Sequence, residues 1–256
     1  MLEQAIQEYV DTNKSARQVA KEFGISKDRL TNVLNKRGLM RPKKDNSYNK
    51  EFFKYIDSEE KAYWLGFIYA DGSITHTKSR NVLEIVLKNE DRDHLYKFKK
   101  AIQYRGDIKD KSVGNYKACR ISLYGEDLVK DLINLGATPR KSFTLTFPTY
   151  LDLELQRHFI RGYYDGDGSV YIYEKLNKIS ISILGTEQFL TRVQDIFIRD
   201  LHITRVKIYD HRNIKEYKKS RKQALKILDY LYKDCTLYLE RKFNKYAHLT
   251  QSLEKC

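Results

Sequence analysis

The feature that most constrains the fold of this chain is a short motif that occurs twice. The pattern glycine, three residues, a small residue and then Asp-Gly-Ser spans 66–73 and recurs at 162–169. Each position of the second copy lies 96 residues after its match, as 167 − 71 = 96 shows. That period is too long for one unit of a solenoid. It indicates a duplicated half-domain with pseudo-twofold symmetry.

Each motif carries two small residues four positions apart, Gly66 and Ala70 in the first and Gly162 and Gly166 in the second. On a helix, residues with this spacing share one face, and small side chains let two helices approach more closely than the usual distance of about 8–10 Å. Glycine costs about 1 kcal/mol inside a helix, so its presence there usually has a packing reason. We therefore expect the two motif helices to pack against each other through these faces.

Each motif ends in an aspartate, Asp71 or Asp167, followed by a glycine, Gly72 or Gly168, that ends the helix and lets the chain turn into a strand. If the helices pack together, the two carboxylates lie side by side at the helix ends. Paired carboxylates in a basic protein suit a hard divalent cation such as Mg²⁺, or Mn²⁺. Such a metal can activate water and stabilise a leaving oxygen at phosphorus. We therefore predict that the two aspartates are metal-binding and catalytic residues.

With these two motifs, the chain resembles the LAGLIDADG homing endonucleases in their single-chain form, over roughly residues 55–250. The resemblance implies an α+β fold in which two αββαββα half-domains, 51–147 and 148–256, form a DNA-binding saddle. It implies Mg²⁺-dependent cleavage of both strands of a DNA target with short 3′ overhangs. It also makes Asp71 and Asp167, at the eighth motif position, the metal ligands. Because one chain supplies both motifs, a monomer is expected.

The resemblance further implies basic residues around the aspartates. The nearest matches are three lysines, Lys88, Lys141 and Lys242, which the resemblance makes candidate catalytic residues. In the second half, the position matching Lys88 falls near Gly185, so that half lacks this lysine, and it stays open whether both strands are cut equally fast. Another departure is Tyr69, which stands where the second motif has Asp165.

Residues 1–40 are expected to form short helices at Gln4–Val10, Ala16–Phe23 and Lys27–Lys36. Ala20, Gly24 and Leu30 lie where a helix-turn-helix needs a small residue, a turn glycine and a core aliphatic residue. This segment resembles the helix-turn-helix family, and its last helix is predicted to contact DNA through Lys27, Arg29, Thr31, Asn32 and Asn35. The alternative is a helical bundle that packs on the main domain without touching DNA.

Two further basic segments are candidates for DNA contact. Residues 41–50 are expected to be a basic linker that follows the phosphate backbone, or else a solvated tether; its candidate residues are Arg41, Lys43 and Lys44. The run 215–222 is expected to be a DNA-contacting loop, with a solvated loop as the alternative; its candidate residues are Lys218, Lys219 and Arg221.

Beyond residue 50, segments in which hydrophobic and polar residues alternate, as in strands, are separated by segments with helical hydrophobic spacing, as in an α+β protein. The predicted strands are Val82–Leu87, Ala118–Leu123, Phe143–Phe147, Lys178–Leu184 and Thr204–Tyr209. The predicted helices are Arg92–Ile102, Glu126–Leu135, Thr186–Arg199 and Gln223–Tyr232.

Composition narrows the class of partner. The chain has 256 residues, with 48 Lys+Arg against 34 Asp+Glu, a net charge of +14 that favours a nucleic acid. Three cysteines without a CxxC pair argue against a disulfide framework or a cysteine-ligated zinc site. The longest uncharged run, 142–151, is too short to cross a membrane, and no signal peptide is recognised at the start. We expect a cytoplasmic protein, of a bacterium, an infected cell or an organelle, with no membrane partner.

The main functional hypothesis is therefore a site-specific endonuclease for double-stranded DNA, encoded by a mobile element. One alternative is a catalytically silent DNA-binding regulator that keeps the saddle as a scaffold. Another is an RNA maturase that binds the RNA of its host intron, because basic charge alone does not separate RNA from DNA.

Overall fold

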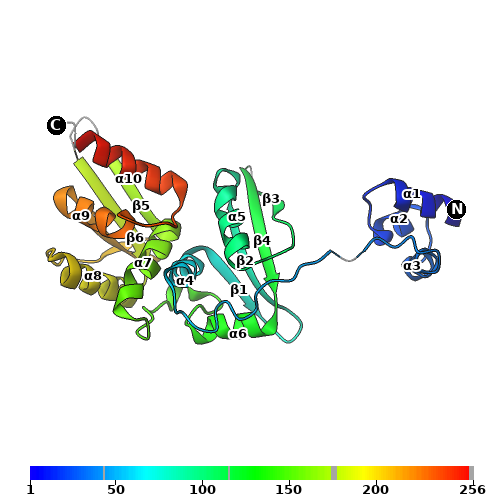
Figure 1. The fold of residues 1–256 in the computed structure, drawn as a ribbon, viewed down its shortest axis with the longest axis horizontal. Helices are drawn as coiled ribbons and strands as arrows, with labels where there is room; N and C mark the ends of the chain where they lie inside the picture. The colour runs from blue at the N-terminus through cyan, green and yellow to red at the C-terminus, as the bar shows by residue number, and fades with distance from the viewer. Residues whose placement is uncertain (43, 115, 174–177, 254–256) are drawn as a thin grey trace. The chain divides into compact units, whose positions relative to one another are not determined.

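The protein is described by a computed structural model that covers residues 1–42, 44–114, 116–173 and 178–253. The chain forms two compact units, Met1–Asp45 and Asn46–Cys256 (Figure 1). Within the described ranges, no helix combines the length and the apolar character that crossing a bilayer requires.

The N-terminal unit is built from α1 (Leu2–Asp11), α2 (Ala16–Glu22) and α3 (Lys27–Lys36). Ser15 and Ser26 accept hydrogen bonds from the backbone N–H groups of Gln18 and Arg29, which caps α2 and α3. Gly24 has a φ of +62°, a left-handed conformation that glycine adopts without strain, and it makes the turn between these helices. The helices enclose a small core of Ala5, Ile6, Tyr9, Val19, Ala20, Leu30 and Leu34.

The second unit repeats one order of elements, helix–strand–strand–helix–strand–strand–helix. The first copy comprises α4 (Glu59–Asp71), β1 (Gly72–His76), β2 (Asn81–Lys88), α5 (Arg92–Ala101), β3 (Lys109–Val113), β4 (Tyr116–Tyr124) and α6 (Glu126–Asn134). The second comprises α7 (Leu153–Asp167), β5 (Gly168–Tyr173), β6 (Lys178–Gly185), α8 (Glu187–Leu201), β7 (Tyr209–His211), β8 (Ile214–Ser220) and α9 (Arg221–Tyr232). Short 3-10 turns are η1 (Asn89–Asp91) and η2 (Lys141–Phe143), and α10 (Glu240–Leu253) follows α9. The predicted pair of αββαββα half-domains is confirmed.

Both half-domains contain an antiparallel sheet with the same topology, β1-β2-β4-β3 and β5-β6-β8-β7. Along β2, the alternate residues Leu83, Ile85 and Leu87 are buried. They pack with Leu95 of α5 and Leu128 of α6 in one hydrophobic core. The helices therefore cover one face of the sheet, and the opposite face is open.

Two predicted strands are wrong. At Phe143–Phe147 the chain forms the end of η2 and then an irregular segment, in which Leu145 and Phe147 are buried while Phe143 is exposed. The alternation of apolar and polar residues here therefore comes from an irregular segment that packs on the core, and not from a strand. The segment Thr204–Tyr209 is likewise irregular up to Tyr209, where β7 begins.

The second error has a specific cause. The backbone N–H of Val206 donates to the Gln194 side chain at 2.7 Å rather than to a neighbouring strand. The other predicted strands and helices agree with the observed elements to within two residues at each end. Strand β3 was not predicted, because this edge strand of Lys, Asp and Ser residues has one partner and no apolar alternation.

The predicted linker 41–50 is partly docked. The backbone N–H of Arg105 donates to the Ser47 carbonyl at 2.9 Å, and that of Asn49 donates to the Ile102 carbonyl at 2.8 Å. The end of the expected linker therefore belongs to the first half-domain. The boundary between the two compact units falls after Asp45.

Candidate active site

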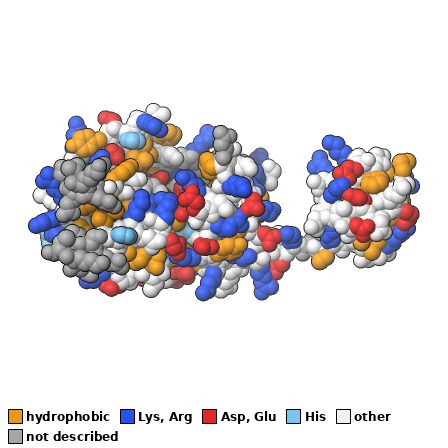
Figure 2. All heavy atoms as spheres, turned by 90° about the horizontal axis from the view of Figure 1, so that it is seen from above, with side chains coloured by type: hydrophobic (Ala, Val, Ile, Leu, Met, Phe, Trp, Pro, Cys, Tyr) orange, Lys and Arg blue, Asp and Glu red, His pale blue; other side chains and the backbone are white. Residues whose placement is uncertain are grey.

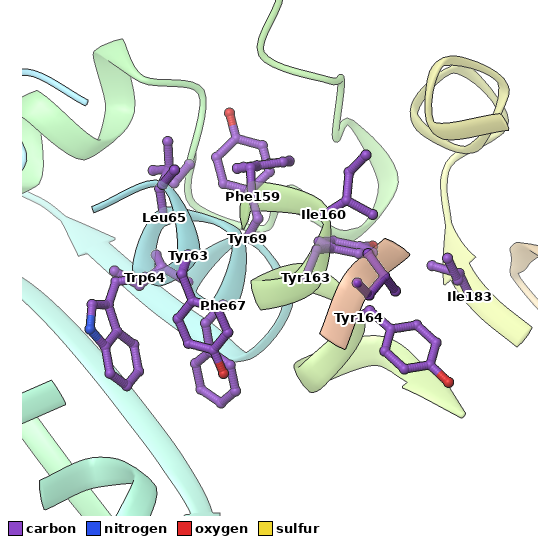
Figure 3. Close-up of a cluster of buried hydrophobic side chains, with 14 of the residues drawn as sticks. Tyr63, Trp64, Leu65, Phe67, Tyr69, Phe159, Ile160, Tyr163, Tyr164 and Ile183 are labelled. Carbon is purple, nitrogen blue, oxygen red and sulfur yellow. The ribbon is translucent and has the colours of Figure 1, made fainter. Parts of the chain in front are cut away.

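The motif helices α4 and α7 touch through their backbones. A Cβ atom added at Gly66 would lie 2.0 Å from the carbonyl oxygen of Phe159, and one added at Gly162 would lie 1.9 Å from that of Tyr63. No side chain fits at either position. Aromatic side chains surround this contact, including Phe67 from α4 and Phe159 from α7 (Figure 3).

One turn further along, the contact continues to the aspartates. A Cβ atom added at Gly166 would lie 2.2 Å from the Cβ of Ala70 and 3.2 Å from Oδ2 of Asp71. Asp71 therefore lies against the backbone of α7 directly before its last residue, Asp167. The structure brings both predicted metal ligands to the shared end of the two helices.

The glycines after the aspartates are required for a reason that the sequence did not indicate. Gly72 and Gly168 have φ values of −74° and −89°, which any residue adopts. However, an added Cβ would lie 2.6 Å from the Ile68 carbonyl oxygen in one case and 2.2 Å from the Tyr164 ring in the other. Each strand therefore starts so close to the preceding helical turn that a side chain has no room.

Burial disfavours the charged form of both aspartates. Burial raises the pKa of Asp71 to about 6, and the Asp167 carboxylate adds to this rise. Burial also raises the pKa of Asp167, against the opposing effect of Lys242 and Lys141. Among the described residues, none donates a hydrogen bond to the Asp71 carboxylate. The Asp71 carboxylate is thus buried beside a second carboxylate and has no hydrogen-bond donor of its own among these residues, an arrangement that suits a cation ligand.

Two of the three predicted lysines lie at the same end of the helices. Lys141 donates to the Gly72 carbonyl, and Lys242 donates to the carbonyls of Tyr164 at 2.6 Å and Gly166 at 3.2 Å. Their positive charge is favoured beside the carbonyl ends of two helices. Both side chains are buried, which lowers the pKa of Lys141 and brings that of Lys242 to about 8.

The third lysine is not part of this cluster. Lys88 is exposed at the end of β2, and no described contact joins it to the aspartates. The strand register also corrects its counterpart. Ile85 pairs with Gly72, and Ile183 pairs with Gly168, so the residue three positions further is Thr186 in the second half rather than Gly185.

Asp165 has a structural role that the sequence does not predict. Its carboxylate is fully buried and accepts hydrogen bonds from the hydroxyls of Tyr63 at 2.6 Å and Tyr232 at 2.5 Å, and from the backbone N–H of Leu239 at 2.8 Å. Its counterpart Tyr69 donates to the Leu135 carbonyl instead. The signal was the Asp-for-Tyr difference between the two motifs.

A divalent metal fits this donor set in part. Among the described residues, no group of three or more His, Cys, Asp or Glu side chains could hold a metal ion. Asp71 and Asp167 would thus supply the two protein carboxylates. Mg²⁺ binds in this manner, through one or two carboxylates with water and phosphate oxygens completing its shell.

The basic run 215–222 is not a loop. Residues up to Ser220 lie in β8, and α9 begins with Arg221. Because side chains alternate along a strand, Lys218 and Lys219 point to opposite faces. Lys218 is exposed, whereas Lys219 is buried and donates to the Thr204 carbonyl and to Gln223 Oε1, the latter at 2.7 Å. Lys219 is therefore unavailable to a partner, while Arg221 is exposed.

The open faces of both sheets carry polar and basic residues. The register places the following side chains on the open face of the first sheet: Ser73, Thr75, Glu84, Val86, Lys88, Lys109, Lys111, Arg120, Ser122 and Tyr124. On the second sheet, the open face includes Ser169, Tyr171, Lys218 and Ser220. Figure 2 shows basic side chains on the visible face of the molecule, with acidic ones among them.

The N-terminal candidates differ in availability. On α3, the side chains of Lys27, Arg29, Asn32 and Asn35 are exposed, and Thr31 is half-buried. The guanidinium of Arg41 instead donates to the carbonyls of Tyr9, Thr12 and Lys14 and lies 4.1 Å from the centre of the Tyr9 ring. Arg41 thus stabilises its own unit. Lys44 is exposed, and Lys43 lies outside the described residues.

Comparison with known proteins identifies similar sequences and folds. The family model described as the LAGLIDADG-like domain matches residues 58–132, from α4 into α6. No curated protein matches the chain at a significant level.

Solved structures resemble most of the chain. The LAGLIDADG homing endonuclease I-GzeII, in complex with its DNA target, is 10% identical with a TM-score of 0.50 and covers 76% of this chain and 91% of its own. The LAGLIDADG homing endonuclease I-LtrWI, bound to target DNA, is 12% identical with a TM-score of 0.50, and the match covers 81% of this chain and 92% of I-LtrWI. WhiA from Thermatoga maritima is 20% identical with a TM-score of 0.47, and the match covers 80% of this chain and 64% of WhiA. Residues 58–132 therefore match the LAGLIDADG-like domain, and the two half-domains have the fold of the LAGLIDADG homing endonucleases.

Proposed function

We propose that the protein is a site-specific endonuclease that hydrolyses both strands of a double-stranded DNA target with Mg²⁺. The observation that carries the proposal is the pairing of Asp71 and Asp167 at the shared end of two helices in backbone contact, with the amines of Lys141 and Lys242 at the same end. Two carboxylates alone would repel a phosphate, and a bound cation reverses that sign.

The residues of the chain divide the chemistry between them. Asp71 and Asp167 hold the metal, and Mg²⁺, when bound, supplies activation of the attacking water and stabilisation of the leaving oxygen. Lys141 and Lys242, fixed by helix-terminal carbonyls, place positive charge where negative charge develops on the phosphate. Each lysine belongs to one half-domain, so each serves one strand, and a monomer has both centres.

The open faces of the two sheets are the proposed DNA-binding surface. Their alternating side chains reach base edges in the major groove, and the net charge of +14 favours a polyanion. In the N-terminal unit, α3 presents Lys27, Arg29, Asn32 and Asn35 at its surface. We propose that this unit is a helix-turn-helix that extends the recognised sequence.

A cleavage assay tests the function directly. A randomised plasmid library, or DNA spanning the uninterrupted insertion site, is incubated with the protein in Mg²⁺ and, separately, in EDTA. Discrete double-strand breaks in Mg²⁺ alone are expected. Specific DNA retention without breaks would favour the DNA-binding regulator, and selective binding of structured intron RNA would favour the maturase.

Replacing either buried lysine should slow one strand selectively. Lys141→Met and Lys242→Met remove the charge but keep most of the apolar stem, so we expect each to slow cutting of one strand by about 10²-fold. The two variants should affect opposite strands. End-labelled duplexes measure the rate on each strand, and equal slowing of both strands by either variant would contradict the assignment of one lysine to each strand.

The neighbouring lysines of β8 provide a matched pair for DNA binding. Lys218→Ala should weaken binding and reduce the slope of log K against log salt by about 1, because one phosphate contact is lost. Lys219→Ala should leave that slope unchanged and destabilise the fold by about 1–3 kcal/mol, because a buried, hydrogen-bonded side chain is removed. Salt titrations and thermal unfolding measure both effects. If Lys219→Ala reduced the salt slope and Lys218→Ala did not, Lys219 would lie on the DNA side of the sheet.

A further inference from the structure

The first turn of α10 carries Lys242, and side chains of the other half-domain hold this turn. Arg241 Nε lies 3.1 Å from Oδ2 and 3.3 Å from Oδ1 of Asp91, in an ion pair that joins residues 150 positions apart. Lys97 of α5 donates to the Tyr238 carbonyl at 2.9 Å and also pairs with Glu240. The turn is thus attached to η1 and α5 of the first half-domain.

Asp91 is placed to act as a rigid anchor. Its side chain is 8% exposed, and η1, which it ends, follows directly after β2. Arg241 is about half exposed and therefore depends on Asp91 for its position. A buried carboxylate that loses its partner is costly, so the pair favours a single arrangement.

A second connection reaches the same turn through the helix interface. The backbone N–H of Leu239, directly before α10, donates to Asp165, and Asp165 accepts from Tyr63 of α4. Asp165 of the same half-domain therefore holds Leu239, and Tyr63 of the first half-domain holds the Asp165 carboxylate in turn. Lys242 lies one residue beyond Arg241, with its amine on the carbonyls of Tyr164 and Gly166.

The pseudo-symmetric corner of the second half-domain makes the reciprocal contact. Thr186, the register counterpart of Lys88 at the end of the second strand, donates through its hydroxyl to the Leu145 carbonyl. Leu145 lies two residues after η2, the turn that begins with Lys141. Thr186 also accepts from the Phe189 N–H at 3.1 Å, which fixes its hydroxyl at the start of α8.

From these contacts we propose that each active-site lysine is positioned by the opposite half-domain, with Asp91 as the positioning residue for Lys242 and Thr186 as that for Lys141. The inference rests on the proposed endonuclease function and deepens it. The two supports differ in kind, since one is ionic and the other is a neutral hydrogen bond. The turn η1, which ends with Asp91, directly follows Lys88, the last residue of β2. The residue proposed to position Lys242 is therefore close in sequence to the proposed DNA-binding face of the first sheet.

The first test measures the rate on each strand. Asp91→Asn keeps the size of the side chain and removes its charge, so it should slow, by about tenfold, the strand that Lys242→Met slows. Thr186→Val should slow the strand that Lys141→Met slows. Glu126→Gln, which disrupts the exposed Glu126–Lys130 pair on α6, is the matched control and should slow neither strand.

The second test does not depend on cleavage. In metal-free protein, amide hydrogen exchange across 238–243 should become at least about threefold faster in Asp91→Asn, with 141–147 unchanged. Thr186→Val should produce the reverse pattern. A variant that unfolds globally would instead accelerate exchange throughout the second unit, so a loss of fold is distinguishable from a local effect.

The outcomes separate this inference from the proposed function. Equal slowing of both strands by Asp91→Asn, or unchanged exchange at 238–243, would overturn the positioning role while leaving the endonuclease intact. If the unaltered protein does not cut DNA, the proposed function is wrong, and the exchange pattern still decides whether Asp91 and Thr186 position the two lysine-bearing segments.

Discussion

Asp71→Asn is expected to abolish cleavage while leaving DNA binding nearly unchanged. The substitution removes one of the two carboxylates that we propose as metal ligands, and Asn offers a neutral oxygen in nearly the same place. We expect the cleavage rate to fall by at least about 10³-fold, as loss of a metal ligand and of its charge stabilisation requires. Asp167→Asn should have the same effect, because the two aspartates share the site.

Cleavage and binding must be measured on the same duplex for this comparison. Cleavage is followed in Mg²⁺, and affinity is measured in EDTA, where we expect the unaltered protein to leave the DNA intact. Glu126→Gln again serves as the control for removal of a carboxylate elsewhere. If both Asp variants still cut at the normal rate, the active site has been placed wrongly.

The same variant should stabilise the metal-free protein at neutral and higher pH. In the folded chain the pKa of Asp71 is about 6, against an ordinary value of 3.8, so the ionised form is disfavoured by folding. The stability associated with the protonated carboxyl is present below pH 3.8 and is lost as the pH rises through about 6. Asp71→Asn avoids that loss.

The expected gain in the free energy of unfolding is at most roughly 3 kcal/mol at pH 8, from about two pKa units at 1.36 kcal/mol each. At pH 4 the gain should nearly vanish, because the carboxyl is then mostly protonated. Thermal unfolding in EDTA at both pH values measures the difference. An equal melting temperature for the two proteins at pH 8 would show that the Asp71 carboxylate is well solvated.

Gly162→Ala is expected to destabilise the fold severely. An added Cβ would lie 1.9 Å from the Tyr63 carbonyl oxygen and 2.9 Å from the Phe67 nitrogen, both of which are backbone atoms. Backbone atoms in a buried helix cannot rotate away as a flexible side chain can, so α4 and α7 must separate. We expect a loss of more than about 3 kcal/mol.

Helix propensity makes the opposite prediction for this variant. Alanine is better than glycine inside a helix by about 1 kcal/mol, so an isolated α7 would gain stability. Chemical unfolding followed by circular dichroism decides which effect is larger, with Ser73→Ala at an exposed position as the control. A more stable Gly162→Ala protein would mean that the two helices are not in backbone contact.

Some features of the site could be predicted because they depend on spacing along the chain. Two small residues four apart share a helix face wherever the helix lies, and the residue after the second is then carried to the same end of the interface. This explains why Gly66, Gly162, Asp71 and Asp167 were found from the sequence. Helix caps such as Ser15 are local for the same reason.

Features that depend on register and solvent could not be predicted. Lys218 and Lys219 are chemically alike and adjacent in the sequence, and the pairing of β8 with β6 decides which of them faces the core. The false strands at Phe143–Phe147 and Thr204–Tyr209 have the alternation of a strand, but none of their residues before Tyr209 has a strand partner. Alternation reports burial on one side, and a core covered by an irregular segment satisfies it equally well.

The sequence by itself determined the duplication, the pair of motif helices and the aspartates that close them, because each follows from residues within about ten positions of one another and from a repeat of those positions. The tertiary structure alone decided why Gly72 must lack a side chain, which residue matches Lys88, and how Asp91 reaches Arg241. These depend on contacts between distant segments, and such contacts are set by the packing of the whole core, which no local pattern encodes.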